Sequence, residues 1–129
     1  MNLFLDPNVF VAAVTDEPDT GSIAVGVLDG DYDFLTSTLN LMELRSVLTK
    51  KERLELSNAE TIQDEITADV RVVIPDASDM MDANRLQRET LLYPLDSAIL
   101  ACAQGHDADL VSFDSELQEA GAVSPADLA

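Results

Sequence analysis

The segment Leu3-Phe4-Leu5-Asp6-Pro7-Asn8-Val9-Phe10 changes within eight residues from an apolar run to a helix-start signal. Asn2–Leu5 is short and apolar, as expected for a buried strand. Asp is favoured at the N-cap of a helix and Pro at its first position, so Asp6-Pro7 predicts the end of that strand and the start of a helix. The first acidic residue of the chain therefore lies at a junction between strand and helix.

The same alternation continues along the chain. Helices are predicted over Asn8–Thr15, Ser22–Leu28, Leu39–Lys51, Asn58–Thr67, Ser78–Leu91, Leu95–Gln104 and Ser115–Ala120, and strands over Phe34–Thr36, Val70–Ile74, Leu110–Phe113 and, at an edge, Ala122–Val123. Strands that alternate with helices predict an α/β three-layer sandwich with a central, mainly parallel sheet of four to five strands flanked by helices. With 129 residues, the chain is expected to form one domain over residues 1–129.

The composition is strongly acidic. Seven Lys and Arg stand against 25 Asp and Glu, a formal charge of −18, and only Lys50 and Lys51 are lysines. Scattered acids of this kind are typical of a protein that works in molar salt, where repulsion is screened, and favour a halophilic origin such as a halophilic archaeon. An ordinary acidic protein kept soluble by its charge is the alternative. We expect Asp76, Asp79 and Asp82 to lie on such a surface at a helix start.

In ordinary salt this charge would argue against nucleic acid as a partner, but in molar salt it describes the solvent rather than the substrate. The longest apolar runs have six residues, whereas a membrane-spanning helix needs about 20. The first residues also lack the features of a signal peptide. We therefore expect a cytoplasmic protein without a membrane segment. A single cysteine excludes a disulfide within the chain and a cysteine-based zinc site.

Acidic residues stand where predicted strands end. Asp6 follows the first strand and Asp114 the fourth, and ligands of open parallel sheets bind beyond the carboxyl ends of the strands. Each of the two residues could instead simply cap the next helix. Asp96 lies in a predicted first helical turn, where the helix dipole alone could favour it.

Glu43 is harder to explain as a surface residue. Its helical neighbours four residues away are Leu39 and Val47, so its carboxylate is expected to project from an apolar face. A buried carboxylate must be paired, protonated or bound to a metal, and Arg45 points to another side of the helix. Several carboxylates without a nearby cation fit a hard divalent ion, Mg²⁺ or Mn²⁺.

Four segments carry these acids in order: Leu3–Phe10, Leu41–Leu48, Tyr93–Ala101 and Ala108–Leu117. In this order and spacing, and from end to end of the chain, the sequence resembles the PIN domain family, in particular the VapC-type toxin ribonucleases. One position departs from the family pattern, because Pro7 stands where Thr or Ser is usual, and a hydroxyl that could orient the Asp6 carboxylate is missing.

The resemblance implies a PIN-like fold and a Mg²⁺- or Mn²⁺-dependent endoribonuclease that cleaves RNA by a metal-activated water. It further implies the toxin component of a toxin–antitoxin pair, a homodimer inhibited by a small antitoxin. A PIN-type nuclease of RNA maturation or quality control, and a catalytically weak PIN fold that binds RNA or protein, are the alternatives. The implied site has Asp6 and Asp96 as metal ligands, Glu43 and Asp114 as acids that complete the catalytic site directly or through water, and Asn8, Ser112 and Glu116 in support, although Glu116 also fits a surface acid of a first helical turn.

Four of the seven basic residues lie within nine positions: Arg45, Lys50, Lys51 and Arg53. Stabilisation of a helix end and local ion pairs account for such a cluster. The alternative is a contact for RNA through Arg45, Lys50 and Lys51, or for an acidic segment of a partner.

Overall fold

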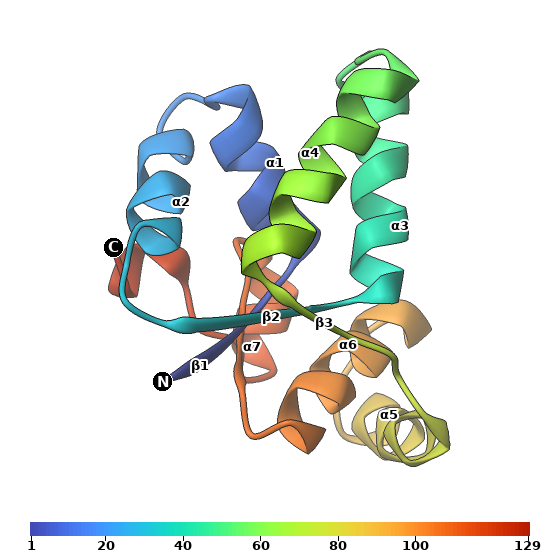
Figure 1. Cartoon of the computed structure of the whole chain (residues 1–129). Coiled ribbons are helices and arrows are strands. Elements are labelled where there is room, and N and C mark those ends of the chain that lie inside the picture. Colours follow the sequence, from blue (N-terminus) through green and yellow to red (C-terminus); the bar gives the residue numbers. More distant parts are fainter.

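The computed structural model of the chain describes residues 1–129. Short strands alternate with helices along the sequence (Figure 1). In chain order the elements are β1 (Asn2–Leu5), α1 (Pro7–Thr15), α2 (Gly21–Leu28), β2 (Asp33–Ser37), α3 (Thr38–Ser46), the π turn η1 (Val47–Lys51), α4 (Leu56–Asp69), β3 (Arg71–Val73), α5 (Ala77–Glu89), α6 (Pro94–Gly105), β4 (Asp109–Val111), α7 (Ser115–Glu119) and the 3-10 turn η2 (Pro125–Asp127).

The strands form one parallel sheet in the order β3-β2-β1-β4. The strand β1 is central: Phe4 lies opposite Leu35 of β2 on one side and opposite Leu110 of β4 on the other. The predicted edge strand Ala122–Val123 is reduced to a single parallel bridge between Val111 and Val123. The predicted α/β architecture with a mainly parallel sheet is confirmed.

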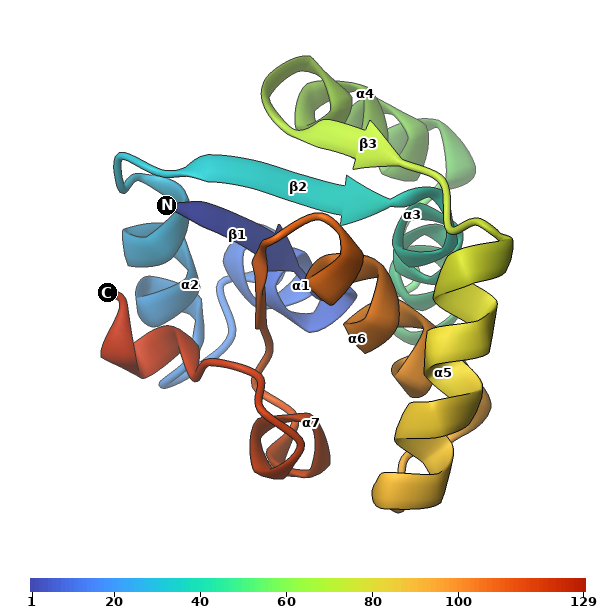
Figure 2. The same ribbon diagram turned by 90° about the horizontal axis from the view of Figure 1, so that it is seen from below.

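Helices cover both faces of this sheet (Figures 1 and 2). Successive side chains of a strand point to opposite faces, and β1 divides its side chains accordingly. Phe4 packs in a cluster with side chains of α5 and α6, while Leu3 and Leu5 pack in a second cluster with side chains of α1, α2, α3 and α4. All three are completely buried. The residues that follow β1 are therefore held between two apolar layers.

Two predicted boundaries are wrong for identifiable reasons. The segment Leu39–Lys51 is not one α-helix. The α-helix α3 ends at Ser46, and the chain then forms the π turn η1. The last strand ends at Val111 and not at Phe113. Beyond Val111 the Ser112 N–H donates to the Val123 carbonyl at 3.2 Å, and the Phe113 N–H donates to a side chain. None of the helices has the length and apolar character that crossing a membrane requires.

The expectation that Asp79 is a surface residue is also wrong, because its side chain is buried. Asp79 and Asp76 form a capping box at the start of α5, in which each carboxylate accepts the other residue's backbone N–H at 2.9 Å. Such reciprocal capping satisfies two N–H groups that have no partner within the helix. The two acids thus serve the helix end.

Candidate active site

A pocket of about 340 Å³ opens at the carboxyl edge of the sheet. It lies beside the ends of β1 and β4, where the strand order reverses, which is the usual ligand position in open α/β sheets. All four acids singled out by the sequence line it. The lining residues are Asp6, Pro7, Asn8, Val11, Glu17, Thr20, Glu43, Val47, Lys51, Glu52, Asp96, Phe113 and Asp114.

Asp6 is the one buried acid of the pocket and is only 7% exposed. Its backbone N–H donates to the Val111 carbonyl at 3.1 Å, which extends the pairing of β1 and β4 by one residue. Its side chain does not cap α1. Instead, Asp6 Oδ2 accepts a hydrogen bond of 2.8 Å from the Ser112 hydroxyl. The alternative explanation of Asp6 as an ordinary helix cap therefore does not apply.

Ser112 is the centre of a hydrogen-bond network. Its Oγ donates to Asp6 Oδ2 and accepts two bonds of 3.0 Å, one from Asn8 Nδ2 and one from the Asp114 N–H. The Asn8 side chain also accepts the Phe113 N–H through Oδ1 at 3.2 Å. A hydroxyl offers one donor and two acceptor positions, so every position of Ser112 is used. Asn8 and Ser112 thus position Asp6 and the backbone of Asp114.

The backbone before Asp6 is fixed as well. The Leu5 carbonyl accepts hydrogen bonds from Thr36 Oγ1 at 3.0 Å and from Asn40 Nδ2 at 3.1 Å. Thr36 belongs to β2 and Asn40 to the first turn of α3, and both side chains are buried. Because Glu43 lies one turn after Asn40, this clamp ties the helix that carries Glu43 to the strand that carries Asp6. No sequence pattern marks Thr36 or Asn40 as residues that position the site.

Glu43 lines the pocket, but the prediction that its carboxylate is buried is wrong. The residue is exposed, and its neighbours Leu39 and Val47 are only half-buried. The side of α3 that packs into the core carries Leu44 and continues through Leu48 of the π turn. Val47, one of these neighbours, lines the open pocket, which a pattern of apolar residues cannot distinguish from a core.

Asp96 and Asp114 reach the pocket from two other elements. Asp96 is half-buried in the first turn of α6. Asp114 is exposed and caps α7, where its Oδ1 accepts the N–H groups of Glu116 at 2.8 Å and Leu117 at 3.2 Å. Its second carboxylate oxygen, Oδ2, accepts no hydrogen bond within the protein. Glu116 is exposed and does not line this pocket, although its charge acts on Asp96.

The electrostatics show that the acids affect one another. Burial, and then the charges of Glu43, Asp96 and Asp114, raise the pKa of Asp6 from 3.8 to about 7 against the lowering effect of the Ser112 bond. Burial and the charge of Asp96 raise the pKa of Glu43, which the charge of Lys51 lowers. Burial and the charge of Asp114 raise the pKa of Asp96. Acids from four separate segments therefore share one site.

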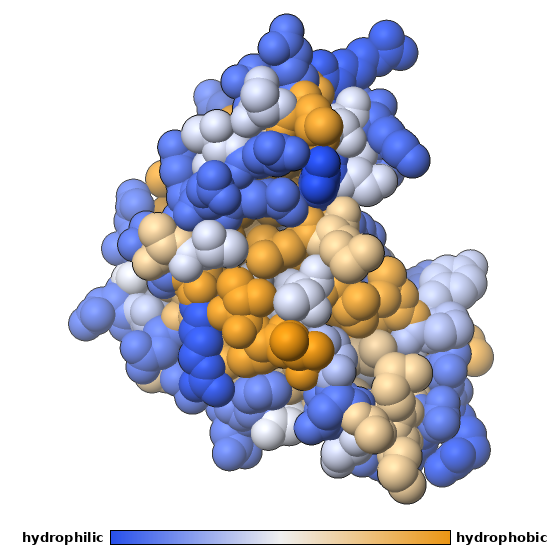
Figure 3. All heavy atoms as spheres, turned by 45° about the vertical axis from the view of Figure 1, so that its right-hand side comes forward, coloured by the Kyte–Doolittle hydropathy of each residue, from blue (hydrophilic) through white to orange (hydrophobic).

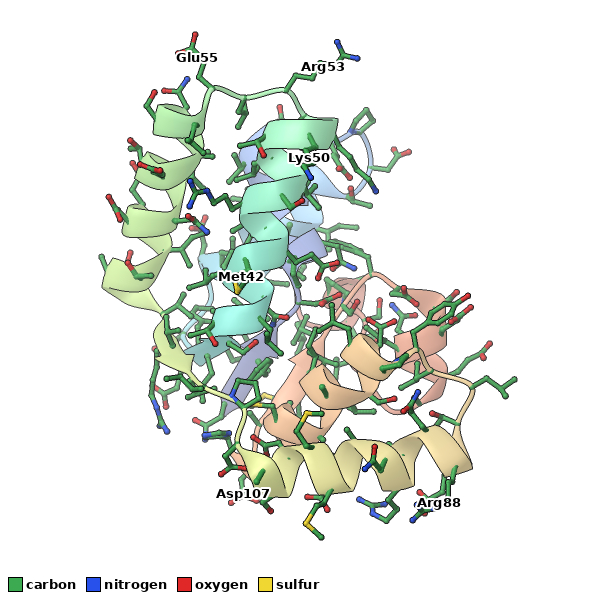
Figure 4. All side chains as sticks on the ribbon, turned by 90° about the vertical axis from the view of Figure 1, so that its right-hand side faces the viewer. Met42, Lys50, Arg53, Glu55, Arg88 and Asp107 are labelled. Atoms are coloured by element: carbon green, nitrogen blue, oxygen red, sulfur yellow. The ribbon has the colours of Figure 1, made fainter.

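The basic residues have different surroundings. Arg45 pairs with Glu60 of α4 at 3.1 Å on the exposed surface, as the local ion-pair explanation expects. Lys50 and Arg53 do not line the pocket, and Arg53 extends outward beyond the end of α3 (Figure 4). Lys51 does line the pocket. The sequence analysis treated Lys50 and Lys51 alike, whereas the structure separates them.

The donor set of the pocket suits a hard divalent ion. Carboxylate oxygens are the ligands that Mg²⁺ and Mn²⁺ prefer, and the raised pKa values show repulsion that a bound cation would relieve. No three Asp, Glu, His or Cys side chains stand close enough to hold one ion directly. This spacing fits an ion held by one or two carboxylates that keeps several of its waters, as Mg²⁺ usually does.

Fold and pocket together define an α/β protein with a carboxylate-lined site at the carboxyl edge of a parallel sheet. Residues 3–123 match the PIN domain. The chain belongs to the PIN domain family, and the resemblance drawn from the four motifs is confirmed. The sequence has no significant match among curated proteins.

Solved structures with the same fold include VapC-type toxins. VapC20 from Mycobacterium tuberculosis, a toxin that cleaves the sarcin–ricin loop, superposes with a TM-score of 0.78 at 19% identity over 94% of this chain and 96% of that one. A toxin–antitoxin complex from Klebsiella pneumoniae gives 0.76 at 17% identity over 95% and 97%. VapBC2 from Rickettsia felis, bound to promoter DNA, gives 0.72 at 19% identity over 92% and 92%. At these identities the similarity establishes the fold.

The raised pKa of Asp6 predicts a pH-dependent cost of folding. Between the unfolded value of 3.8 and the folded value of about 7, the folded state binds more protons, so stability falls as the pH rises through this window. In EDTA at pH 8, Asp6→Asn should therefore be more stable than the wild type, by up to about 4 kcal/mol. At pH 4 the two should be nearly equal. Urea unfolding at both pH values measures the difference.

Asp64→Asn is the matched control for this prediction, because Asp64 is an exposed carboxyl of α4. It should change stability little and equally at both pH values. Equal stabilities of Asp6→Asn and wild type at pH 8 would contradict the prediction.

The hydrogen bonds of Ser112 predict that replacing this residue lowers the stability of the protein. Ser112→Ala leaves the Asn8 amide and the Asp114 N–H without an acceptor and takes a donor from Asp6, so the free energy of unfolding should fall by about 1–3 kcal/mol. Ser115→Ala, at an exposed position of α7, should change it by less than about 0.5 kcal/mol. Thermal or urea unfolding distinguishes them, and equal effects of the two variants would refute the role given to Ser112.

Proposed function

We propose that this protein is a divalent-metal-dependent endoribonuclease and the toxin component of a toxin–antitoxin pair. The observation that carries the proposal is the convergence of Asp6, Glu43, Asp96 and Asp114 on one pocket at the carboxyl edge of the sheet. The family of the chain and the VapC fold of its structural relatives support the same function.

Asp6 and Asp96 would hold Mg²⁺ or Mn²⁺, with Glu43 and Asp114 acting directly or through bound water. When bound, such an ion polarises a phosphate and lowers the pKa of a water that can attack it. Ser112 and Asn8 keep the Asp6 carboxylate in one orientation, and the cap formed by Asp114, which lines the pocket, uses only one of its two carboxylate oxygens. The protein thus supplies carboxylate oxygens that would hold the ion, and the ion would in turn attract the substrate phosphate.

The proposal includes two protein partners. A small antitoxin would inhibit the enzyme by inserting a segment near the acidic pocket, where an Arg side chain could satisfy the carboxylates. A second copy of the chain would form a homodimer. Apolar side chains gather on the face shown in Figure 3, and Met42 and Ile74 are 68% and 73% exposed, which supports a protein partner on the surface.

A second candidate function rests on Pro7. Its ring lines the pocket next to Asp6 at a position where a hydroxyl is usual in the family. The ring fits the first position of α1, where the backbone N–H has no partner to lose, so the fold is unaffected. A PIN fold that binds RNA or protein and cleaves weakly is therefore the alternative.

The proposed activity predicts RNA cleavage at molar KCl in the presence of Mg²⁺ or Mn²⁺ and none in EDTA. Asp6→Asn and Asp96→Asn should each reduce the rate by a factor of about 100 or more, because each removes a charged ligand of the ion. Asp64→Asn should cleave like the wild type. Gel analysis of a labelled RNA measures the rates, and full activity of both site variants would overturn the site assignment.

The alternative predicts a different outcome for Pro7→Thr. If the missing hydroxyl limits catalysis, this variant should cleave at least about tenfold faster than the wild type, since general positioning effects of this size are common. If the protein is an efficient nuclease as it stands, the two rates should agree within a factor of about 2. The same cleavage assay decides between the two functions.

A further inference from the structure

We propose that Lys51 positions the RNA substrate by binding a phosphate that neighbours the one cleaved, and that the π turn Val47–Lys51 brings it there. This inference rests on the proposed function and deepens it, because it assigns a contact for the RNA backbone beyond the four acids.

The first support is helical geometry. Glu43, Val47 and Lys51 follow one another at intervals of four residues, and all three line the same pocket. An α-helix advances about 100° per residue, so each interval of four turns the side chain by about 40°. In an uninterrupted α-helix Lys51 would point about 80° away from Glu43.

The π turn largely cancels this rotation of the side-chain direction around the helix axis. A π-helix has about 4.4 residues per turn, so four residues fall short of a full turn by about 33° and nearly cancel the preceding 40°. Lys51 consequently returns to the side of the helix that carries Glu43. The extra residue of the π turn is what orients the lysine, while Lys50, its neighbour in sequence, does not reach the pocket.

The π turn is well anchored. The Glu52 N–H donates to the Val47 carbonyl at 3.0 Å, and the Leu54 N–H donates to the Leu48 carbonyl at 2.9 Å. Leu48 is completely buried, and Arg53 takes a left-handed conformation with φ of 57° that ends the helix. π turns are rare and are found frequently at functional sites. Here the turn replaces a regular helix end at the edge of the acidic pocket.

The second support is charge. The pocket is lined by one cation, Lys51, and by six carboxylates: Asp6, Glu17, Glu43, Glu52, Asp96 and Asp114. Lys51 forms no ion pair, since the two salt bridges of the structure join Arg45 to Glu60 and Arg85 to Glu89. Its ammonium group is therefore available to a ligand. The six carboxylates repel an RNA phosphate that enters the pocket, a nearby cation counters this repulsion, and lysine binds phosphate as a point charge.

The test compares Lys51→Gln with wild type in cleavage of a short single-stranded oligoribonucleotide of mixed sequence, at saturating Mg²⁺ and in molar KCl. Lys51→Gln should raise KM about three- to tenfold and change kcat by less than about twofold, because the lost contact is to the bound substrate and not to the reacting phosphate. Lys51→Arg should restore most of the affinity, and Lys50→Gln should raise KM less than Lys51→Gln. Arg88→Gln, on the last turn of α5 (Figure 4), is the control for loss of one positive charge.

Direct binding gives a readout that does not depend on cleavage. In an Asp96→Asn background, the affinity for the same oligonucleotide is measured across a series of KCl concentrations. Adding Lys51→Gln should weaken binding three- to tenfold and reduce the slope of log affinity against log salt by about 0.7, the value for one phosphate contact on a single strand. Arg88→Gln should leave the slope unchanged.

The outcomes test the proposed function and the role of Lys51 separately. If the wild type does not cleave RNA, the proposed function fails. If it cleaves while Lys51→Gln keeps its KM and salt slope, the function stands and this inference is overturned. A fall in kcat with unchanged RNA binding would overturn it as well, since Lys51 would then act on the acids alone. Thermal unfolding checks that each variant is folded, and Lys51→Met replaces Lys51→Gln if that variant is not.

Discussion

The hydrogen bond from Ser112 to Asp6 is the contact on which the site depends. It joins the residue that follows β1 to the residue that follows β4 at the point where the strand order reverses. The Asn8 side chain and the Asp114 backbone N–H donate to the same Ser112 hydroxyl, which holds both in place. A short loop beyond a strand would otherwise leave a carboxylate free to turn into solvent. Here the Ser112 hydroxyl uses its donor and both of its acceptor positions, and the orientation of Asp6 follows from the pairing of the two strands.

The carboxylates that this arrangement brings together repel one another. Like charges that share a partly buried site raise one another's pKa, and the fold supplies one lysine among six lining carboxylates. Apolar packing on both faces of the sheet provides the stabilisation that offsets this repulsion, since Leu3, Phe4 and Leu5 of β1 are completely buried. The clamp of Thr36 and Asn40 on the Leu5 carbonyl adds hydrogen bonds that cannot be lost without leaving a buried carbonyl unpaired.

The sequence predicted the strands, the helices and the parallel sheet because period and turn residues agree along most of the chain. It placed Asp6 and Asp114 at one edge of the sheet, because strand ends are visible in local patterns, whereas Asp96 joined them only through the resemblance to the PIN domain family. It misplaced the side chain of Glu43, because an apolar neighbour looks the same whether it faces a core or an open pocket. It could not separate Lys51 from Lys50, since a π turn has no signal in a pattern with the period of an α-helix. The burial of Asp79 was missed for a related reason: a capping box on a helix that packs tightly against α6 looks like an acidic surface turn. The contact between the two helices is so close that a Cβ added to Gly105, the last residue of α6, would lie 3.0 Å from Asp79 Oδ1.

Salt screens the charges on the surface of the chain more strongly than the buried charges of the pocket. In molar salt, the condition proposed for the cleavage assay, the Debye length is about 3 Å, so carboxylates scattered over the surface hardly act on one another or on an approaching RNA. Within the pocket, Asp6 is only 7% exposed and Asp96 is half-buried, and burial heads the causes that raise the pKa of Asp6, Glu43 and Asp96. Their repulsion therefore persists where that of the surface is screened, and only a cation inside the pocket relieves it. An acidic protein can accordingly take a polyanionic substrate if the cations it needs are local. In the proposed function these are a divalent ion at the acids and the single lysine at their edge, so the overall charge of −18 does not argue against an RNA substrate.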